Sequence, residues 1–358
     1  MGSAVMNTSE DAQEFALGLD NTAYFPKDNN SYYHCSDFEY FPIQNCLDSF
    51  TAPQKSHSSI LLTGNSQLHG INQPDKGLNS TSQILYQSLK DQNNRFLAVS
   101  VPNMNLQEQL LLNIYIASKI PISHMIIAAS FDNTRETSIR ESLIPALKEQ
   151  QVLQSLERLS FGKKIIQTYG EKDNAGNNLS IEEDNLQQKV EKILDKSLVQ
   201  QWSAWGMRER LRFRSIVEVY QLRNRVLGIT PNSIRKKIPA RYVDNLESLR
   251  NIMEFASQKG IKVLVYSPPI RSDQKLPYNL DEFDSFKDDI QDIAEAYNFN
   301  FADFQSKVPS QYWGFVSGAD SNTGDKEIDF MHFQGEGHTF LAKEILATID
   351  QMEWFKDQ

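Results

Sequence analysis

Short apolar runs recur along the chain, and each is closed by glycine, proline or polar residues. The runs lie at 59–63, 95–101, 124–129 and 261–267. Continuous apolar runs of this length are typical of strands buried on both faces, as in a parallel sheet. Apolar residues recur at helical spacing over 107–119, 243–259 and 339–350. The alternation of strand and helix predicts an α/β fold around a mostly parallel sheet.

A long interruption separates the third run from the fourth. It is rich in Gln, Glu, Lys and Leu, and helical periodicity appears over 183–198 and 202–227. We predict a helical insertion over the sheet. The residues before the first run are polar and aromatic without a sustained period, which predicts an irregular extension that wraps the core. The predicted order is extension, first part of the α/β domain, insertion and second part of the domain, at 1–58, 59–135, 136–242 and 243–358.

The charge balance disfavours one class of partner. The 358 residues are 40% hydrophobic and carry a formal net charge of -10, which is the composition of a soluble globular protein. Because phosphate neutralisation requires a basic surface, we expect no nucleic-acid partner. One stretch of the insertion is basic nevertheless, and it comprises Arg208, Arg210, Arg212, Arg214, Arg223 and Arg225 with Arg235, Lys236 and Lys237 after them. It is either a solvated face paired with acidic neighbours or a docking surface for anionic lipid headgroups.

The cysteines and the N-terminus bear on the compartment. Cys35 and Cys46 are the only cysteines, too few for a disulfide scaffold and without the CxxC spacing of a zinc site. They form one disulfide in an oxidising compartment or remain buried thiols. No run of about 18 apolar residues occurs, so the sequence predicts no membrane span. Met1, Gly2 and Ser3 resemble a vector-derived leader, so a natural anchor or export signal could precede residue 4.

A serine follows the first predicted strand. In Gly64-Asn65-Ser66 the glycine permits a tight turn, and the serine on that turn is placed at the carboxyl edge of the sheet. Open α/β sheets bind their ligands at this edge. We also expect Ser66 to lie near a helix N-terminus, whose free N–H groups stabilise negative charge. Alone, a Gly-x-Ser turn is more often structural than catalytic.

A histidine near the C-terminus supplies a possible partner for this serine. Asp329 precedes His332 by three residues, in what the pattern predicts to be a loop before the last helix. A carboxylate at this spacing can turn back to accept the imidazole N–H and fix the tautomer whose other nitrogen accepts a proton from a serine. The alternative is that Asp329 caps a turn and His332 has no chemical role.

Together these motifs resemble those of the SGNH/GDSL hydrolase superfamily. Its first motif is Gly-Asp-Ser after the first strand, its last is Asp-x-x-His before the final helix, and the match runs in order over most of 59–350. The resemblance implies a three-layer, flavodoxin-like fold. It implies that Ser66 is the nucleophile, His332 the general base and then acid, and Asp329 the residue that orients His332. The Ser66 backbone N–H would be one oxyanion donor, and neither a metal nor another cofactor would be needed.

The chain departs from the superfamily pattern in its middle motifs. Asn103 stands where the second motif has a glycine, although asparagine tolerates the left-handed backbone that would aim its N–H at an oxyanion. Asp132 stands where the third motif has its oxyanion-binding asparagine. An ionised carboxylate would repel an oxyanion. Three alternatives follow: Asn133 swings into the oxyanion site, Asp132 is protonated, or ordinary hydrolase activity is lost. The candidate oxyanion or substrate-binding residues are Asn65, Asn103, Asp132 and Asn133.

Within the superfamily, the chain is similar to proteins that work beside membrane-bound O-acyltransferases, such as the D-alanyl transfer protein of teichoic acids and the alginate O-acetylation proteins. The similarity lies in the substituted Gly-Asp-Ser, in 101–111 and in 263–269. It implies an acyl donor, a hydroxyl acceptor such as a glycan, and a membrane-bound O-acyltransferase partner. It also implies a periplasmic or other extracytoplasmic location with an N-terminal tether.

Three functional hypotheses follow. The first is a serine-dependent O-acyltransferase or acylesterase that forms an acyl-enzyme on Ser66. The second is a catalytically weak or inactive scaffold of the same fold that binds a membrane acyltransferase or a glycan, and Asp132 motivates it. The third is a cytoplasmic esterase without a membrane partner. The distance between the side chains of Ser66 and His332 separates the first from the second.

Overall fold

The computed structural model describes residues 34–35, 43–51, 59–68, 79–91, 95–101, 103–170, 234–317 and 326–356. A six-stranded sheet forms its centre, and every neighbouring pair of strands in it is parallel. The strands are β1 (His34–Cys35), β2 (Ser59–Gly64), β3 (Arg95–Ser100), β4 (Ile122–Ala128), β5 (Lys262–Ser267) and β6 (Asn300–Asp303). The four predicted strands are therefore confirmed as β2 to β5.

The order of the strands places the site. Across the sheet they run β1-β3-β2-β4-β5-β6. Without β1 this is the flavodoxin order, in which the chain first winds to one side of its starting strand and then to the other. The reversal lies between β2 and β4, and ligands of open α/β sheets bind beyond the carboxyl ends of the strands at such a point. The predicted flavodoxin-like fold is thus correct, and Ser66 follows one of the two strands that flank the reversal.

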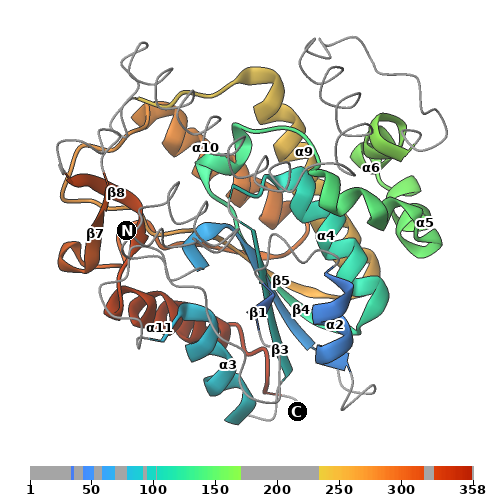
Figure 1. The fold of residues 1–358 in the computed structure, drawn as a ribbon, viewed down its shortest axis with the longest axis horizontal. Helices are drawn as coiled ribbons and strands as arrows, with labels where there is room; N and C mark the ends of the chain where they lie inside the picture. Colours follow the sequence, from blue (N-terminus) through green and yellow to red (C-terminus); the bar gives the residue numbers. More distant parts are fainter. Residues whose placement is uncertain are drawn as a thin grey trace, which may run out of the picture.

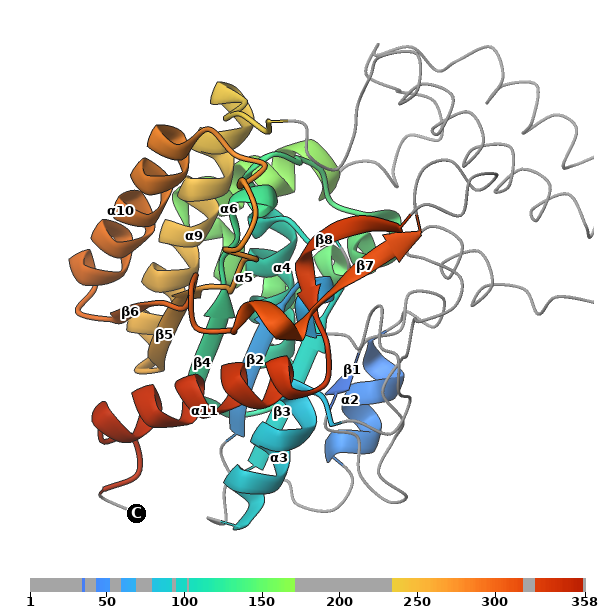
Figure 2. The same ribbon diagram turned by 90° about the vertical axis from the view of Figure 1, so that its left-hand side faces the viewer.

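Helices cover both faces of the sheet and complete three layers (Figures 1 and 2). The first face packs against α2 (Gln44–Thr51), α4 (Leu106–Lys119), α9 (Pro239–Lys259) and α10 (Leu280–Ala296). The second face packs against α3 (Thr81–Asp91) and α11 (Glu336–Gln351). Successive strand residues divide between two cores because side chains alternate across a strand. Leu61 and Val263 lie in the first core, whereas Leu62 and Leu264 lie in the second.

The helix ends follow local sequence rules. At the start of α4, the Asn105 side chain accepts a hydrogen bond from the Glu108 backbone N–H while the Glu108 side chain accepts one from Asn105, which is a capping box. Helix α9 has Pro239 in its first turn and ends at Gly260, whose φ of 66° is in the left-handed region that favours glycine. The predicted helices at 107–119, 243–259 and 339–350 correspond to α4, α9 and α11.

The remaining described elements are short. The start of the predicted insertion forms η3 (Glu141–Lys148), α5 (Gln150–Glu157), α6 (Ser160–Ile165) and η4 (Ile166–Gly170). A separate antiparallel hairpin consists of β7 (Trp313–Ser317) and β8 (Lys326–Phe333), with η6 (Ser310–Tyr312) before it. The helical periodicities at 183–198 and 202–227 and the arginines from 208 to 225 lie outside the described residues. No described helix is both long and apolar enough to cross a membrane.

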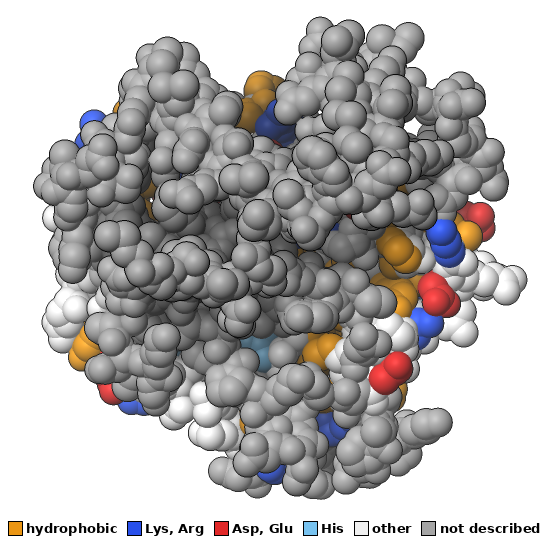
Figure 3. Space-filling model, in the orientation of Figure 1, with side chains coloured by type: hydrophobic (Ala, Val, Ile, Leu, Met, Phe, Trp, Pro, Cys, Tyr) orange, Lys and Arg blue, Asp and Glu red, His pale blue; other side chains and the backbone are white. Residues whose placement is uncertain are grey.

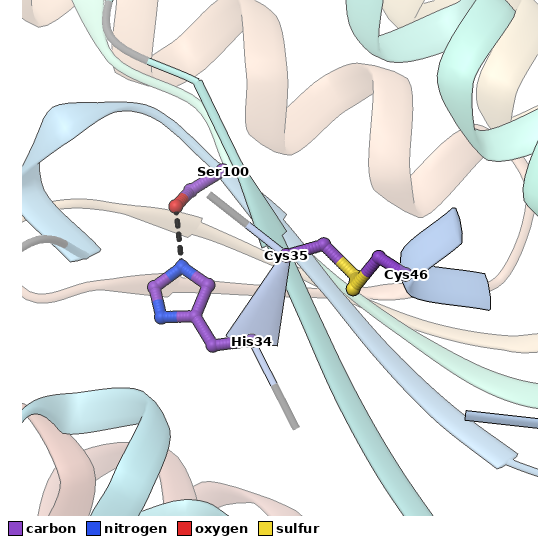
Figure 4. The surroundings of a disulfide bond; sticks show 4 residues. All are labelled: His34, Cys35, Cys46 and Ser100. Carbon is purple, nitrogen blue, oxygen red and sulfur yellow. Dashed lines mark hydrogen bonds between the residues drawn. A yellow bond between two sulfur atoms is a disulfide. The ribbon is translucent and has the colours of Figure 1, made fainter. Parts of the chain in front are cut away.

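A disulfide joins Cys35 to Cys46 and attaches the N-terminal segment to the sheet (Figure 4). Strand β1 pairs with β3, and the bond links it to α2, which lies on the first face. These elements fall within 1–58, the segment predicted to be irregular. The neighbouring His34 points to the other side of the strand, where its Nε2 lies 2.6 Å from Ser100 Oγ.

Charged side chains of both signs are interspersed on the described part of the face drawn in Figure 3. Two residues of the predicted basic stretch are described with acidic partners. Arg235 pairs with Asp132, and Lys237 Nζ lies 3.6 Å from Asp289. For these two residues, pairing with acidic neighbours is therefore correct.

Candidate active site

The turn after β2 presents Ser66 at the carboxyl edge of the sheet. Gly64 ends the strand, and a Cβ built on it would lie 2.8 Å from Leu68 Cδ1 and 3.1 Å from Ala128 Cβ, so the close packing here excludes larger side chains. Ser66 begins η1 (Ser66–Leu68), a single 3-10 turn. Ser66 was expected to lie near a helix N-terminus, and it is the first residue of this short turn; the next described helix begins at Thr81. The turn positions the hydroxyl.

The side chain of Asn65 is occupied within the fold. Its Nδ2 donates to Ser130 Oγ at 3.1 Å, and its Oδ1 accepts the backbone N–H of Gln67 at 3.0 Å. Ser130 follows β4, so Asn65 connects the turns after the two strands that flank the reversal. Asn65 therefore shapes the turn, and its amide already has partners on both sides.

Asp329 and His332 lie on β8, whereas the sequence pattern predicted a loop. The physical reason is the hairpin with β7, in which Trp313 pairs with Phe333 across a register shift. Residues three apart on a regular strand point to opposite faces. Here the Asp329 Oδ1 accepts the backbone N–H groups of Met331 and His332, both at 3.0 Å, and this turns the backbone so that the two side chains meet.

Ser66, His332 and Asp329 come together in one hydrogen-bonded series. Ser66 Oγ lies 3.0 Å from His332 Nε2. The other ring nitrogen, Nδ1, lies 3.0 Å from Asp329 Oδ2 and 3.2 Å from Oδ1. With the Nδ1 proton donated to the carboxylate, Nε2 is free to accept a proton from the serine. Ser66 and His332 are 266 positions apart in sequence, and the fold brings them within hydrogen-bond distance.

The carboxylate of Asp329 is buried, with 4% of the residue exposed. Burial alone would raise the pKa of Asp329, but the adjacent His332 and the backbone N–H groups of Met331 and His332 lower it below the ordinary value. The group therefore remains ionised at neutral pH. An ionised carboxylate at Nδ1 both orients the imidazole and stabilises the imidazolium that forms when Nε2 accepts a proton.

Asn103 follows β3, beside β2 in the sheet, and adopts the left-handed backbone that its residue type allows. Its φ is 55° and it is exposed. Within the described part of the chain, neither its backbone N–H nor that of Ser66 donates to another group. Two unengaged N–H groups thus lie after adjacent strands at the edge that carries Ser66.

The amide of Asn133 is engaged in contacts within the fold. Its Oδ1 accepts the Ser130 backbone N–H at 2.7 Å and the Ser130 hydroxyl at 2.8 Å, while its Nδ2 donates to the Met104 carbonyl. Asn133 is buried, and these contacts use both ends of its amide. It therefore connects the turn after β4 to the segment that carries Asn103.

Asp132 is an ion-paired carboxylate. Its Oδ2 accepts from Arg235 Nη1 and, at 2.9 Å, from the Tyr278 hydroxyl, while Arg135 lies 3.7 Å from Oδ1. Burial alone would lower the pKa of Arg235, but Asp132 raises it above the ordinary value. The Tyr278 hydroxyl also lies 3.4 Å from Met331 Sδ, next to His332. The negative charge expected to oppose an oxyanion is thus countered by a guanidinium.

Sequence reasoning missed three residues of this region. Gln67 donates to the backbone of two distant segments, Arg235 neutralises Asp132, and Tyr278 connects Asp132 to Met331. Their partners in these contacts are 53 to 264 residues away in sequence, so no local pattern marks them. Only Arg235 had a signal, as part of the basic stretch.

A second serine–histidine pair provides an internal contrast. Ser100 Oγ lies 2.6 Å from His34 Nε2, but Ser100 is fully buried, with 0% exposed (Figure 4). His338 lies in the first turn of α11, where its Nδ1 lies 3.0 Å from Thr81 Oγ1. Among the described residues, no group of three or more His, Cys, Asp or Glu is arranged to hold a metal ion.

No protein-family model matches the chain, and no curated protein matches its sequence. Among solved structures it is similar to a GDSL-like lipase from Bacteroides thetaiotaomicron, with 10% identity, a TM-score of 0.37, and coverage of 87% of this chain and 97% of that chain. A putative acylhydrolase from Bacteroides fragilis is 10% identical with a TM-score of 0.37, and the match covers 88% of this chain and 98% of that chain. A mutant acetyl-xylooligosaccharide esterase from Geobacillus is 13% identical with a TM-score of 0.34, and the match covers 82% of this chain and 95% of that chain. All three TM-scores are below 0.5.

Proposed function

We propose that this protein is a serine esterase or acylhydrolase of the SGNH/GDSL type, with Ser66 as nucleophile. The observation that carries the proposal is the series Ser66 Oγ, His332 and Asp329, with 3.0 Å between serine and imidazole and 3.0 Å between imidazole and carboxylate. The order of motifs along the chain and the position of Ser66 at the reversal of the sheet support it.

The chemistry follows from this geometry. Ser66 Oγ attacks the carbonyl carbon of an ester, and its proton passes to His332 Nε2, while Asp329 stabilises the imidazolium. The tetrahedral oxyanion accepts hydrogen bonds from the backbone N–H groups of Ser66 and Asn103. When the intermediate collapses, Nε2 returns the proton to the leaving alkoxide and an acyl-Ser66 ester remains.

Deacylation repeats the same steps with a second nucleophile. A water or a hydroxyl acceptor loses its proton to His332 Nε2 and attacks the acyl-Ser66 carbonyl, after which Ser66 recovers the proton. Water gives hydrolysis, and an acceptor hydroxyl gives O-acyl transfer. We favour a glycan or similar acceptor and a membrane-bound O-acyltransferase partner, on the sequence resemblance alone.

An extracytoplasmic location belongs to the same proposal. The bond between Cys35 and Cys46 supports it, because disulfides form and persist in oxidising compartments. A reducing compartment would open the bond and leave two thiols. Thiol counting after extraction under acid conditions, which trap the native redox state, tests this point directly: two reactive thiols per chain would contradict it.

The scaffold alternative receives less support. It requires that Ser66 and His332 cannot approach, whereas they lie within hydrogen-bond distance. Its other motive was an uncompensated Asp132, and this carboxylate is paired with Arg235. Both observations favour an enzyme.

The test is covalent labelling by a fluorophosphonate probe, with the modified peptide identified by mass spectrometry, followed by turnover of an aryl acetate. We expect the probe on Ser66, no labelling in Ser66→Ala or His332→Ala, and retained labelling in Ser100→Ala, the matched control from the buried serine–histidine pair. Ser66→Ala should fold normally, because a turn hydroxyl contributes little to the core. An unlabelled native protein would contradict the proposal.

A further inference from the structure

Gln67, the residue after Ser66, connects three parts of the site through its own polar groups. Its backbone N–H donates to Asn65 Oδ1 within the turn at 3.0 Å. Its side-chain Nε2 donates to the carbonyl of Pro269 at 2.7 Å and to that of Met331 at 2.8 Å. Both protons of the amide nitrogen are therefore used on backbone carbonyls that lie 202 and 264 residues away in sequence.

The two carbonyls belong to two separate segments, the loop after β5 and strand β8, whose relative position affects the proposed chemistry. Pro269 follows β5 in the central sheet. Met331 stands between Asp329 and His332 on β8, and the hairpin of β7 and β8 is not hydrogen-bonded into the six-stranded sheet. Gln67, which follows the proposed nucleophile Ser66 in sequence, thus contacts β8, the strand that carries His332.

One acceptor of the Gln67 amide is unpaired. Gln67 is buried, with 3% exposed, and its Oε1 has no hydrogen-bond partner among the described residues. An unpaired buried acceptor costs free energy. A flipped amide would not help, because Oε1 would then face two carbonyl oxygens. The arrangement is one in which both donors are committed to the two segments at the expense of the acceptor.

A second anchor holds the hairpin without contacting Ser66. The Arg271 backbone N–H donates to Phe330 at 3.2 Å, and its guanidinium donates to Gly314 on β7 at 3.0 Å. The hairpin therefore remains attached to the loop after β5 when Gln67 is changed. What Gln67 adds is the direct connection between the Ser66 turn and Met331.

We propose that Gln67 is a positioning residue that sets the distance between Ser66 Oγ and His332 Nε2 by holding the Met331 carbonyl, an inference that rests on the proposed esterase function. Loss of the two donations releases β8 toward its other anchor and lengthens the path of the proton from serine to imidazole. Displacements of about 1 Å in such a pair cost about a hundredfold in rate. The effect falls on the acyl-transfer step and hence on kcat, and substrate affinity changes little.

The test compares two buried glutamines with the same chemistry. Gln109 on α4 also donates its Nε2 to a backbone carbonyl, that of Ala128 at 3.1 Å, and its Oε1 is also buried without a partner. For Gln67→Met we expect fluorophosphonate labelling and kcat for an aryl acetate to fall at least tenfold with KM within about twofold. Gln109→Met should label at the native rate. Gln67→Asn, which keeps an amide too short to reach both carbonyls, should fall between them and serves if Gln67→Met fails to fold.

A crystal structure of the Gln67 variant separates this inference from the proposed function. We expect Ser66 Oγ and His332 Nε2 to lie beyond hydrogen-bond distance in the variant. If the pair stays at its native distance and labelling proceeds at the native rate, positioning by Gln67 is wrong while the esterase stands. If the native protein is not labelled, the esterase fails, and the separation of the pair in the variant alone decides whether Gln67 positions it.

Discussion

In the proposed reaction, Asp329 acts only through His332. Its two oxygens contact the imidazole Nδ1 and the backbone N–H groups of Met331 and His332, so it holds both the ring and the chain that carries it. Because the pKa of Asp329 is lowered, its contribution to stability is present above its ordinary pKa and is lost only as the pH falls through the lower, folded value. The orienting charge therefore persists throughout the neutral and mildly acidic range.

Asp329→Asn should lower kcat by about three to four orders of magnitude while leaving the fold intact. An asparagine can still accept the backbone N–H groups, but its amide N–H₂ toward Nδ1 favours the tautomer in which Nε2 carries the proton and cannot accept one from Ser66. Aryl acetate kinetics with circular dichroism as the folding control check this. A loss of less than tenfold would indicate that the carboxylate is structural.

Some residues of the candidate site could be predicted from local sequence patterns, and others could not. Ser66 was predictable from the turn after a strand, and the Asp329/His332 pair from its spacing of three. Gln67 was not, because its partners are backbone carbonyls of segments that only the fold brings near. The roles assigned to Asn65, Asn103 and Asn133 remain predictions, although the amides of Asn65 and Asn133 are occupied by contacts within the fold.

At the scale of elements, the segment at 234–238 meets the turn after β4. Arg235 donates to Asp132, its backbone N–H donates to the Pro277 carbonyl at 2.7 Å, and Tyr278 completes the contact with Asp132. One charged pair therefore joins three segments next to the site. Its electrostatic effect on the site can be separated from its structural one because the two charges can be removed singly or together.

Arg235→Gln should slow fluorophosphonate labelling by about tenfold, since it leaves only Arg135, 3.7 Å away, to offset the effect of the Asp132 charge on the proposed oxyanion. Asp132→Asn should label at least as fast as the native protein, and the double variant should recover most of the loss. Labelling rates and urea unfolding of all four proteins form a double-mutant cycle. Additive effects in the labelling rates would show that the pair does not act on the site through its charge.

The predictable elements were those with long periodic or continuous apolar patterns, namely β2 to β5, α4, α9 and α11. Strand β6 escaped because it is a half-exposed edge strand of four residues with only Phe301 and Ala302 apolar. The hairpin of β7 and β8 was not predicted because its strands, Trp313–Ser317 and Lys326–Phe333, pair across a register shift and are not joined by a tight two-residue turn. Strand β1 has only two residues. Its pairing with β3 and its disulfide, and not a local sequence pattern, define it.

At the scale of the whole molecule, the end of the sheet opposite Ser66 contains a buried titratable group. His124, near the start of β4, has its ring 4.5 Å from that of Trp354 and 5.6 Å from that of Phe355, at the C-terminal end of the described chain. Burial, with a smaller contribution from Lys262, lowers the pKa of His124 to about 4. The folded protein thus keeps this imidazole neutral where the unfolded chain would protonate it.

Acidification should therefore destabilise the fold well before the carboxylates titrate. Since the folded pKa lies below the unfolded value near 6.5, stability falls as the pH drops from there toward 4, by about 2 kcal/mol between pH 7.5 and 5. Urea unfolding across this range measures the slope, and His124→Phe, which keeps an aromatic ring without a titratable nitrogen, should flatten it. An unchanged slope in that variant would place the pH dependence elsewhere.

The disulfide should stabilise the molecule by restricting the unfolded chain. Its cysteines are 11 residues apart, a loop for which the chain-entropy model gives about 3 kcal/mol. Cys35→Ser/Cys46→Ser should lower the free energy of unfolding by about this amount. Fluorophosphonate labelling of the folded double variant should be unchanged, because β3 lies between β1 and the strand that leads to Ser66. A loss of labelling with the fold intact would indicate that the N-terminal segment contributes to the site.

The position of β1 has a further consequence for the reduced protein. This strand covers part of the outer edge of β3 at Ala98 and Val99, and the disulfide holds it there. An uncovered strand edge presents unpaired N–H and C=O groups in a row, which is a template for intermolecular β-pairing. Reduction of the disulfide should therefore release β1 and expose this edge of β3. We expect the reduced protein to self-associate, to a degree that rises with protein concentration and is reversed by oxidation.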